Sequence, residues 1–244
     1  YEWLPGGAGL LVCGAWDLAC SDCRIRDCCS VDGAVAGSGC QVTLNRCLVD
    51  GNDEGAGIAF RGIDASTLEQ CTVVHNAEGV HVTLEDHLAV NASIIAFNAG
   101  VGLYGEEMYG EFFAYVTLTC SDLYGNGTDL ICVCEQIGYF GNFSADPLFC
   151  DCDRGDFHLA ANSPCLPANN TCASELGALG LGCASGRVIR VPQEAPSIAA
   201  GLAAALPRDT VLVASGTYAE HDLELPAGVV LRSAAAPPFG AVID

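Results

Sequence analysis

Apolar and polar residues alternate over short segments that recur about every two dozen residues along the first half of the chain. Residues 20–28, 44–52, 68–76, 90–98 and 118–126 align, and each reads apolar-x-x-[Cys/Ser]-x-[aliphatic]-x-x-[Asn/Cys]. Alternation with period two is typical of β-strands, and the repeat is too short for a helical crossover between strands. The pattern therefore predicts a solenoid whose coils of short strands stack about 4.8 Å apart.

The alignment places the same residue type at the same point of each coil. The small and aliphatic columns are predicted to point inward and form the core. Asparagine at a corner tolerates the left-handed conformation, and its amide can bond to the asparagines above and below it, so we interpret these asparagines as structural. The predicted ladder is Asn52, Asn76, Asn98 and Asn126, and the small core column is Cys23, Cys47, Cys71, Ser93 and Ser121.

These repeats resemble the right-handed parallel β-helix repeat family, the pectin-lyase-like solenoids, and the resemblance covers nearly the whole chain. Residues 140–183, with ADPLF, SPC and LGALGLGC, are similar to the end of such a domain in secreted bacterial members. Residues 191–244 are similar to the family's N-terminal start, with SIAAGLAAAL as a capping helix and DTVLVASGTY as the first strands. The resemblance implies an all-β, right-handed parallel β-helix with a short capping helix in the C-terminal segment.

The resemblance also predicts the domain organisation. We expect β-helix coils over residues 1–139 and the closing end of the solenoid over 140–186. Residues 187–244 are expected to be the capping helix and first coils of a further solenoid unit. Roughly six coils would separate the ends of the body by about 30 Å. The five residues from Cys183 to Val188 span at most about 18 Å, which is too short a return path.

The C-terminal segment is therefore predicted to complete the solenoid of a neighbouring copy. The protein would be a subunit of a head-to-tail filament, or one period of a tandem β-helix array. A fragment whose last segment starts an unrelated domain is the alternative. The predicted junction residues are Tyr1, Ile198, Leu202, Val211, Val213 and Asp244.

Charge narrows the choice of partners. The formal net charge is −21, and all nine basic residues are arginines. Such a surface repels phosphate backbones and anionic lipids, so neither nucleic acid nor a membrane is expected as a partner. No apolar run in the sequence is long enough to span a bilayer.

Sixteen cysteines indicate an oxidising compartment and an extracellular location, with disulfides favoured over a zinc site. The isolated pairs Cys20/Cys23 and Cys132/Cys134 do not repeat as zinc-binding motifs do, and we expect neither a metal nor a cofactor. Inward cysteines are expected to pack as small hydrophobes. Residues 140–186, the tail of the solenoid, have few predicted strands to hold them together. The cysteines of this tail are therefore predicted to be mostly bridged by disulfides: Cys150, Cys165, Cys172 and Cys183.

Carbohydrate-cleaving enzymes that resemble this chain place carboxylates on outward columns of adjacent coils. None of three outward columns holds two carboxylates, and lysine is absent from the chain, so we expect no enzymatic activity. The alternative is a carbohydrate-active protein, either a polysaccharide lyase or a glycoside hydrolase, or a carbohydrate-binding protein with a glycan partner. The columns are Asn45, Glu69, Asn91, Thr119; Asp50, Val74, Ala96, Tyr124; and Leu48, Thr72, Ile94, Asp122.

Overall fold

The computed structural model describes residues 10–13, 17–28, 33–62, 65–83, 87–105, 107–108, 111–112, 115–183, 186, 188–205, 209–226, 228–234 and 241–243. The chain divides into two compact units, Tyr1–Gly182 and Cys183–Asp244. This division lies close to the boundary predicted before residue 187.

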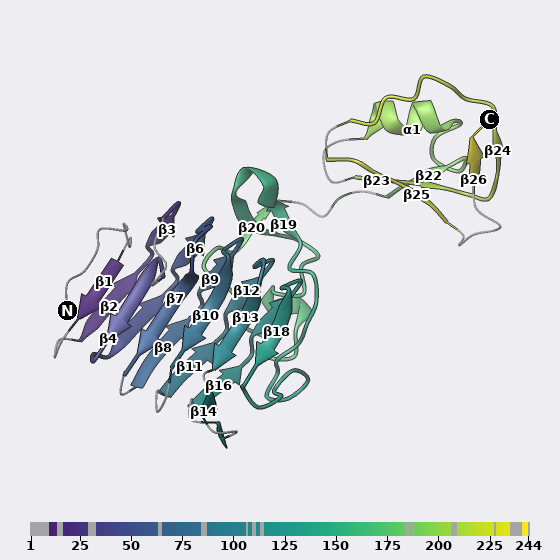
Figure 1. The fold of residues 1–244 in the computed structure, drawn as a ribbon. Helices are drawn as coiled ribbons and strands as arrows, with labels where there is room; N and C mark the ends of the chain where they lie inside the picture. Colours follow the sequence, from purple (N-terminus) through teal and green to yellow (C-terminus); the bar gives the residue numbers. More distant parts are fainter. Residues whose placement is uncertain are drawn as a thin grey trace. The chain divides into compact units, whose positions relative to one another are not determined.

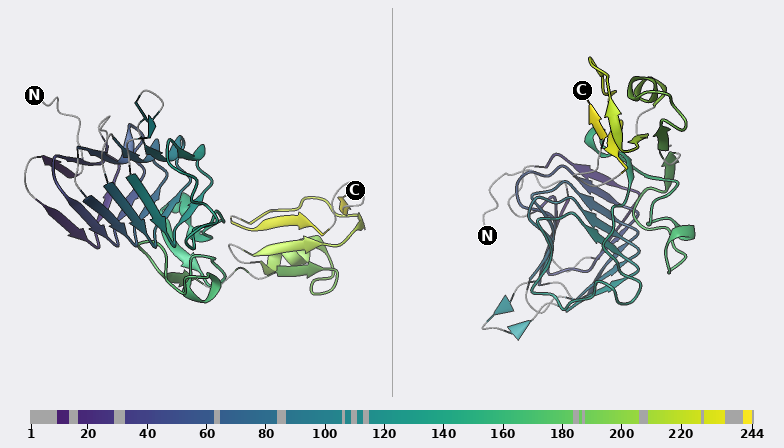
Figure 2. Two further views of the ribbon diagram at one scale, coloured as in Figure 1. Left: turned by 90° about the horizontal axis from the view of Figure 1, so that it is seen from below. Right: turned by 90° about the vertical axis from the view of Figure 1, so that its right-hand side faces the viewer.

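The first unit is a parallel β-solenoid with three sheets as walls (Figure 1). Sheet A contains β1 (Leu10–Cys13), β4 (Val35–Ser38), β7 (Ala56–Arg61), β10 (Glu78–Val82), β13 (Val101–Gly105) and β18 (Thr128–Ile131). Sheet B contains β2 (Leu18–Ser21), β5 (Val42–Asn45), β8 (Ala65–Glu69), β11 (His87–Asn91) and β16 (Tyr115–Thr119). Sheet C contains β3 (Arg24–Arg26), β6 (Leu48–Asp50), β9 (Thr72–Val74), β12 (Ile94–Ala96) and β17 (Asp122–Tyr124). Figure 2 shows strands of successive coils stacked within each wall.

Alternation within each strand fills the interior of the solenoid. On sheet C, Val49 pairs with Val73, which pairs with Ile95, and all three side chains are fully buried. The bend between sheets B and C contains one residue with φ between 45° and 54° in every coil. These residues are Asp22, Arg46, Gln70, Ala92 and Cys120. The turn is thus repeated in backbone geometry although its side chains differ.

The closing segment of the first unit folds against the outer face of sheet C. It contains β19 (Phe149–Asp151), the 3-10 helices η1 (Cys152–Arg154) and η2 (Pro167–Asn169), β20 (Asp156–Ala160) and β21 (Leu181–Cys183). Elsewhere β14 (Glu107–Met108) and β15 (Glu111–Phe112) form an antiparallel hairpin. The closing segment forms a second apolar core with sheet C, which includes Leu48, Val74, Ile94, Ala96, Phe149, Phe157, Leu159, Cys165 and Leu176.

The second unit contains the one α-helix of the described residues. It consists of β22 (Val188–Val191), α1 (Ile198–Ala204), β23 (Thr210–Val213), β24 (Gly216–Tyr218), β25 (Val230–Ser233) and β26 (Ala241–Ile243). Strands β22, β23 and β25 form one parallel sheet, and β24 pairs in parallel with β26. Ser197 caps α1 by accepting a hydrogen bond from the Ala200 N–H at 3.1 Å. The all-β parallel solenoid with a single short helix is therefore confirmed.

In the described part of the chain, no helix combines the length and apolar character needed to cross a bilayer.

Candidate functional site

Amide side chains form a continuous ladder along the corner of the solenoid. Asn52 Nδ2 donates to Asn76 Oδ1 at 2.6 Å, Asn76 Nδ2 to Asn98 Oδ1 at 3.0 Å, and Asn98 Nδ2 to Asn126 Oδ1 at 2.9 Å. The same oxygens also accept backbone N–H groups from the preceding rung at 3.0 to 3.2 Å. The asparagine side chains therefore form hydrogen bonds between adjacent coils, which is the structural role that the sequence predicts for them.

The small column points into the core, as its spacing predicts. Cys47, Cys71, Ser93 and Ser121 are fully buried, and Cys23 in the first coil is half-buried. Ser93 Oγ accepts a hydrogen bond from the Cys71 N–H at 3.0 Å and donates one to the Asn91 carbonyl at 2.8 Å. A small side chain with one polar atom fits this position, because that atom bonds to backbone beside the bend.

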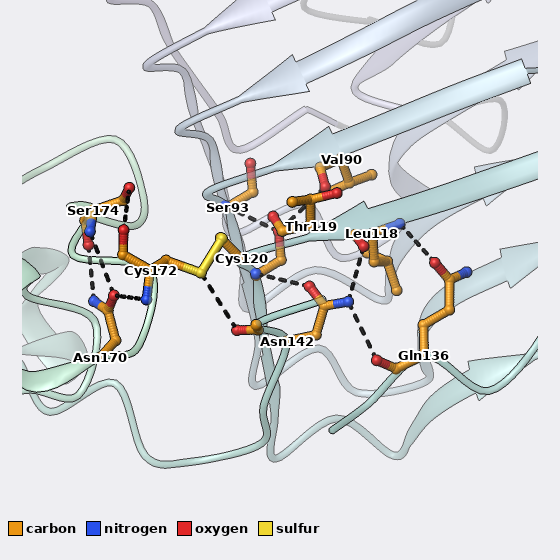
Figure 3. The surroundings of a disulfide bond; sticks show 12 residues. Val90, Ser93, Leu118, Thr119, Cys120, Gln136, Asn142, Asn170, Cys172 and Ser174 are labelled. Atoms are coloured by element: carbon orange, nitrogen blue, oxygen red, sulfur yellow. Dashed lines mark hydrogen bonds between the residues drawn. A yellow bond between two sulfur atoms is a disulfide. The ribbon is translucent and has the colours of Figure 1, made fainter. Parts of the chain in front are cut away.

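The structure pairs three of the four tail cysteines predicted to be bridged. Cys172 is bonded to Cys120 across a sequence separation of 52 residues (Figure 3). Cys150 and Cys183 are also disulfide-bonded. Cys165 is a free thiol, so its predicted bridge is wrong. Its sulfur is enclosed in the second apolar core, where it donates a hydrogen bond to Asp122 Oδ2 at 3.3 Å.

Asp122 is a fully buried carboxyl group on β17. Its Oδ1 accepts a hydrogen bond from the Ala145 N–H at 3.0 Å, while Cys165 contacts the other oxygen. Burial raises the pKa of Asp122 to about 7. The pKa of the Cys165 thiol is also raised, first by burial and then by the nearby carboxylate. The pair links the last coil to the closing segment.

Strand pairing confirms the registers used to search for an active site but not the exposure of every column. Asn45, Glu69, Asn91 and Thr119 lie in register on sheet B and are half-buried or exposed. On sheet C, the column from Leu48 to Asp122 and most of the column from Asp50 to Tyr124 are buried. These two columns point away from the interior of the solenoid, as predicted, but the closing segment covers them, so the expectation that they form an exposed site is wrong.

Asp50 is buried in the column that begins on β6. Both of its oxygens accept hydrogen bonds from the Arg24 guanidinium, each at 2.9 Å. A carboxylate held in this bidentate way is neutralised and positioned by the first coil. It therefore serves as a tie between coils rather than as a free acid or base.

Sheet A carries a groove that sequence reasoning missed. Its volume is about 350 Å³, and Arg61, Glu78 and His81 line it together with the small residues Gly55, Ala56, Ala59, Ala77 and Gly100. Ala59 pairs with His81, which pairs with Tyr104, so these side chains share one column. The rings of His81 and Tyr104 meet edge to face at 4.7 Å. Aligning the second strands of each repeat would have revealed this column.

One end of the first unit is closed by side-chain amides (Figure 3). Gln136 Oε1 accepts from the Leu118 N–H at 2.8 Å, and its Nε2 donates to the Val116 carbonyl at 2.9 Å. Asn142 similarly accepts from the Ser121 N–H and donates to the Leu118 carbonyl, at 3.0 and 2.9 Å. These amides satisfy the backbone of β16 as a further strand would.

The other end of the first unit is open in the described residues. There, no strand pairs with the outer edge of β1, β2 or β3. The inward side chains of Leu18 and Ile25 are only half-buried, whereas Val42 and Val49 in the next coil are fully buried. The described residues therefore cover the core of the first coil less completely than the cores of the internal coils.

Among its described residues, the second unit also has one covered end and one open end. Helix α1 packs beside β22 and β23, and Ile189 and Val211 are buried. Their column partner on β25, Leu231, is half-buried. Val242 and Ile243 on β26 are 56% and 47% exposed. Apolar side chains thus become exposed toward β25 and β26.

The predicted junction residues that the structure describes do not lie on this exposed surface. Ile198, Leu202, Val211 and Val213 are buried in the second unit's own core, and their role at a junction stays a prediction. Tyr1 and Asp244 lie outside the described residues.

The stacked registers, the amide ladder and the left-handed bends define a parallel β-helix protein. Residues 5–135 match the model of the family described as the right handed beta helix region. The match covers more than half of the chain, and the protein belongs to this family, as the repeat predicted. No curated protein and no solved structure matches the chain. Because this fold hosts many activities, function must be inferred from the sites.

Proposed function

We propose that the protein is a structural subunit of an extracellular head-to-tail assembly. In this assembly the second unit of one copy is completed by the first coils of another. One observation carries the proposal: among the described residues, each unit has one covered end and one end at which strand edges and apolar side chains are uncovered. In the part of the chain that the structure describes, the body is open at its first coil, and the second unit is open at β25 and β26.

The open ends offer both parts of a coil-to-coil contact. Parallel edge strands present unpaired backbone groups, which favour the addition of another strand. Stacking a coil on β25 and β26 would also cover Leu231, Val242 and Ile243, while Leu18 and Ile25 would gain cover on the other copy. Donated coils of this kind would bury more than about 2,000 Å² in total, the range of obligate interfaces.

The same contact would form within a tandem array, where one continuous chain joins successive units. In the isolated 244-residue chain, both arrangements lead to the same expectation of end-to-end oligomers. An extracellular location is supported by the disulfides of Cys120, Cys150, Cys172 and Cys183, because disulfides persist in oxidising compartments.

Electron microscopy and analytical ultracentrifugation of the full chain test the proposal. We expect linear oligomers that lengthen with protein concentration. Val242→Asp should reduce them to monomers, because it places a charge on the open end at a side chain that is already 56% exposed. Tyr139→Asp is the matched control, since Tyr139 is 63% exposed near the closed end. A wild-type chain that stays monomeric, or equal loss in both variants, would contradict the proposal.

The groove on sheet A favours glycan binding as a second candidate function. The His81 ring can contact a sugar face, while Arg61 and Glu78 can bond to hydroxyl groups. Among its described lining residues Glu78 is the sole carboxylate, whereas glycoside hydrolysis generally requires two. The groove therefore favours binding over cleavage. Isothermal titration with neutral and acidic oligosaccharides tests this function, and His81→Ala should weaken any binding that occurs in the groove.

A further inference from the structure

A disulfide and two thiols share the interior of the first three coils. Cys20 and Cys23 are bonded to each other, and Cys47 and Cys71 are buried free thiols in the next two coils. The sulfur atoms of Cys20, Cys23 and Cys47 all lie within 4.8 Å of one another. This places a nucleophile beside a disulfide, which is the arrangement that thiol–disulfide exchange requires.

The column position itself does not require cysteine. Cys47 and Cys71 donate hydrogen bonds to the carbonyls of Asn45 and Glu69, each at 3.4 Å. One coil further, Ser93 makes the equivalent bond to Asn91 with a hydroxyl group. Cysteine therefore keeps the geometry of the column and adds reactivity, and it does so in the coils nearest the disulfide.

We infer that Cys20, Cys23 and Cys47 form an internal thiol–disulfide exchange site. The Cys47 thiolate attacks Cys23 Sγ, and a sulfur–sulfur bond forms between Cys23 and Cys47. The Cys20–Cys23 bond breaks, and its electron pair leaves on Cys20 Sγ. That sulfur takes up one proton, which balances the proton lost by Cys47. One disulfide and one thiol exist before and after the step, so no external oxidant or reductant is consumed.

The register of the coils accommodates the product. The Leu48 N–H donates to the Cys23 carbonyl at 2.8 Å, which places Cys23 and Cys47 side by side in adjacent coils. Parallel strands lie about 4.8 Å apart, within the usual Cα separation of about 4.4–6.8 Å for disulfides. The Cys23–Cys47 bond would link the first coil covalently to the second, whereas the Cys20–Cys23 bond closes within one coil.

Cys71 supplies a reason for Cys47 to act as the nucleophile. When Cys47 is ionised, the Cys71 thiol can donate to it instead of to the Glu69 carbonyl. This interaction lowers the pKa of Cys47 to about 6 and raises the pKa of Cys71. Burial and the carboxylate of Asp22 oppose the shift at Cys47 without cancelling it. The thiolate is the attacking form, so Cys47 is available for exchange near neutral pH.

The absence of lysine makes the exchange simple to follow. Trypsin cleaves this chain only after arginine, so Cys20 and Cys23 fall in peptide 1–24 and Cys47 falls in peptide 47–61. The native full-length protein is incubated with excess N-ethylmaleimide, which alkylates Cys20 when exchange releases it. After an acid quench and a non-reducing digest, we expect the two peptides joined with one maleimide on Cys20. Fragmentation spectra distinguish this product from linkage through Cys13.

Variants separate the roles of the thiols. Cys47→Ser should abolish the joined peptides, and the column tolerates serine, as Ser93 shows. Cys165→Ser, which removes a different buried thiol, should leave their formation unchanged. Cys71→Ala should move the midpoint of the pH–rate profile upward by roughly one to two pH units. Cys71→Ser, which retains a donor, should move it less.

Two results would overturn the inference. One is an intact Cys20–Cys23 bond, with no joined peptides after prolonged incubation above neutral pH. The other is a stoichiometric metal ion in the purified protein with Cys20, Cys23 and Cys47 all reduced, which would assign the three sulfurs to metal binding.

Discussion

The guanidinium of Arg24 on β3 binds both carboxylate oxygens of Asp50 on β6, each at 2.9 Å, and so joins the first coil to the second. The Asp50 side chain is 4% exposed, and that of Arg24 is 39% exposed. Arg24→Ala would leave a buried carboxylate without its main partner. We expect a loss of about 2 kcal/mol in urea unfolding, below the range for a fully buried pair because Arg24 is partly solvated.

The exposed pair of Arg46 and Asp22 provides the control for this prediction. Its nitrogen–oxygen distance is 2.7 Å, but both side chains are more than half exposed. Arg46→Ala should change the unfolding free energy by less than about 1 kcal/mol. Equal losses in the two variants would contradict the role assigned to Asp50.

Asp122 should make the stability of the first unit fall as pH rises from about 4 to about 7. Burial raises its pKa in the folded state to about 7 from the model-compound value of 3.8. Between these values the folded chain holds a proton that the unfolded chain has lost, so raising the pH favours unfolding. Thermal unfolding measured across this range should show a smaller decline in Asp122→Asn. An unchanged slope in that variant would contradict the prediction.

Removal of one asparagine from the ladder should destabilise the protein more than removal of an asparagine on the outer face. Asn76 accepts bonds from Asn52 and donates to Asn98 and to the Val49 carbonyl. Asn76→Ala leaves several buried polar groups unpaired, with an expected cost of about 3 kcal/mol or more. Asn45→Ala on the outer face of sheet B should cost less than about 1 kcal/mol. Chemical denaturation of the two variants compares them directly.

The Cys120–Cys172 disulfide should stabilise the attachment of the closing segment. The bond closes a loop with a sequence separation of 52 residues. The loop-entropy relation gives about 4 kcal/mol for its removal. The double variant Cys120→Ser/Cys172→Ser should therefore unfold at lower denaturant concentration, while Cys165→Ser should shift the midpoint less. A double variant as stable as the wild type would contradict this role.

Assembly should respond to salt because every copy is strongly acidic. With a net charge of −21, two copies repel each other, and ionic strength screens that repulsion. Sedimentation should show longer oligomers in higher salt. Val242→Asp should remain monomeric under the same conditions, which separates end-to-end contact from non-specific aggregation.

The sequence predicts the interior of this protein better than its surface. The positions that Asn76 and Val73 occupy recur in every coil at a nearly fixed spacing, because every coil imposes the same inward environment. Alignment of the sequence with itself is therefore enough to locate them. The closing segment does not follow the repeat, so its packing cannot be predicted by alignment. Its sequence does not show that Phe157 lies over sheet C and helps to bury columns that otherwise point outward. Likewise Cys165 looks like the other tail cysteines, and only three-dimensional packing shows that it lies against Asp122.

The groove on sheet A could not be predicted from the sequence either. Arg61 on β7 comes from one coil and Glu78 and His81 on β10 come from the next, and none of them occupies a position in the main repeat alignment. Their proximity depends on how the strands of sheet A follow the variable turns. The similarity of residues 191–244 to the family's N-terminal start predicts that further coils continue this segment, but which side chains expose apolar surface, such as Val242, depends on where each strand stops receiving cover.

The asparagine ladder has a mechanical consequence. Its bonds join successive coils along the direction of stacking, as do the bonds of the three sheets. Tension along that direction loads the coils in series, so each coil bears the full force and the weakest contact yields first. Rupture should begin at the open first coil and proceed one coil at a time. The amide-closed end, fastened by Cys120 and Cys172, should be the last to give way, and a pulling experiment would record a sawtooth of small, evenly spaced steps.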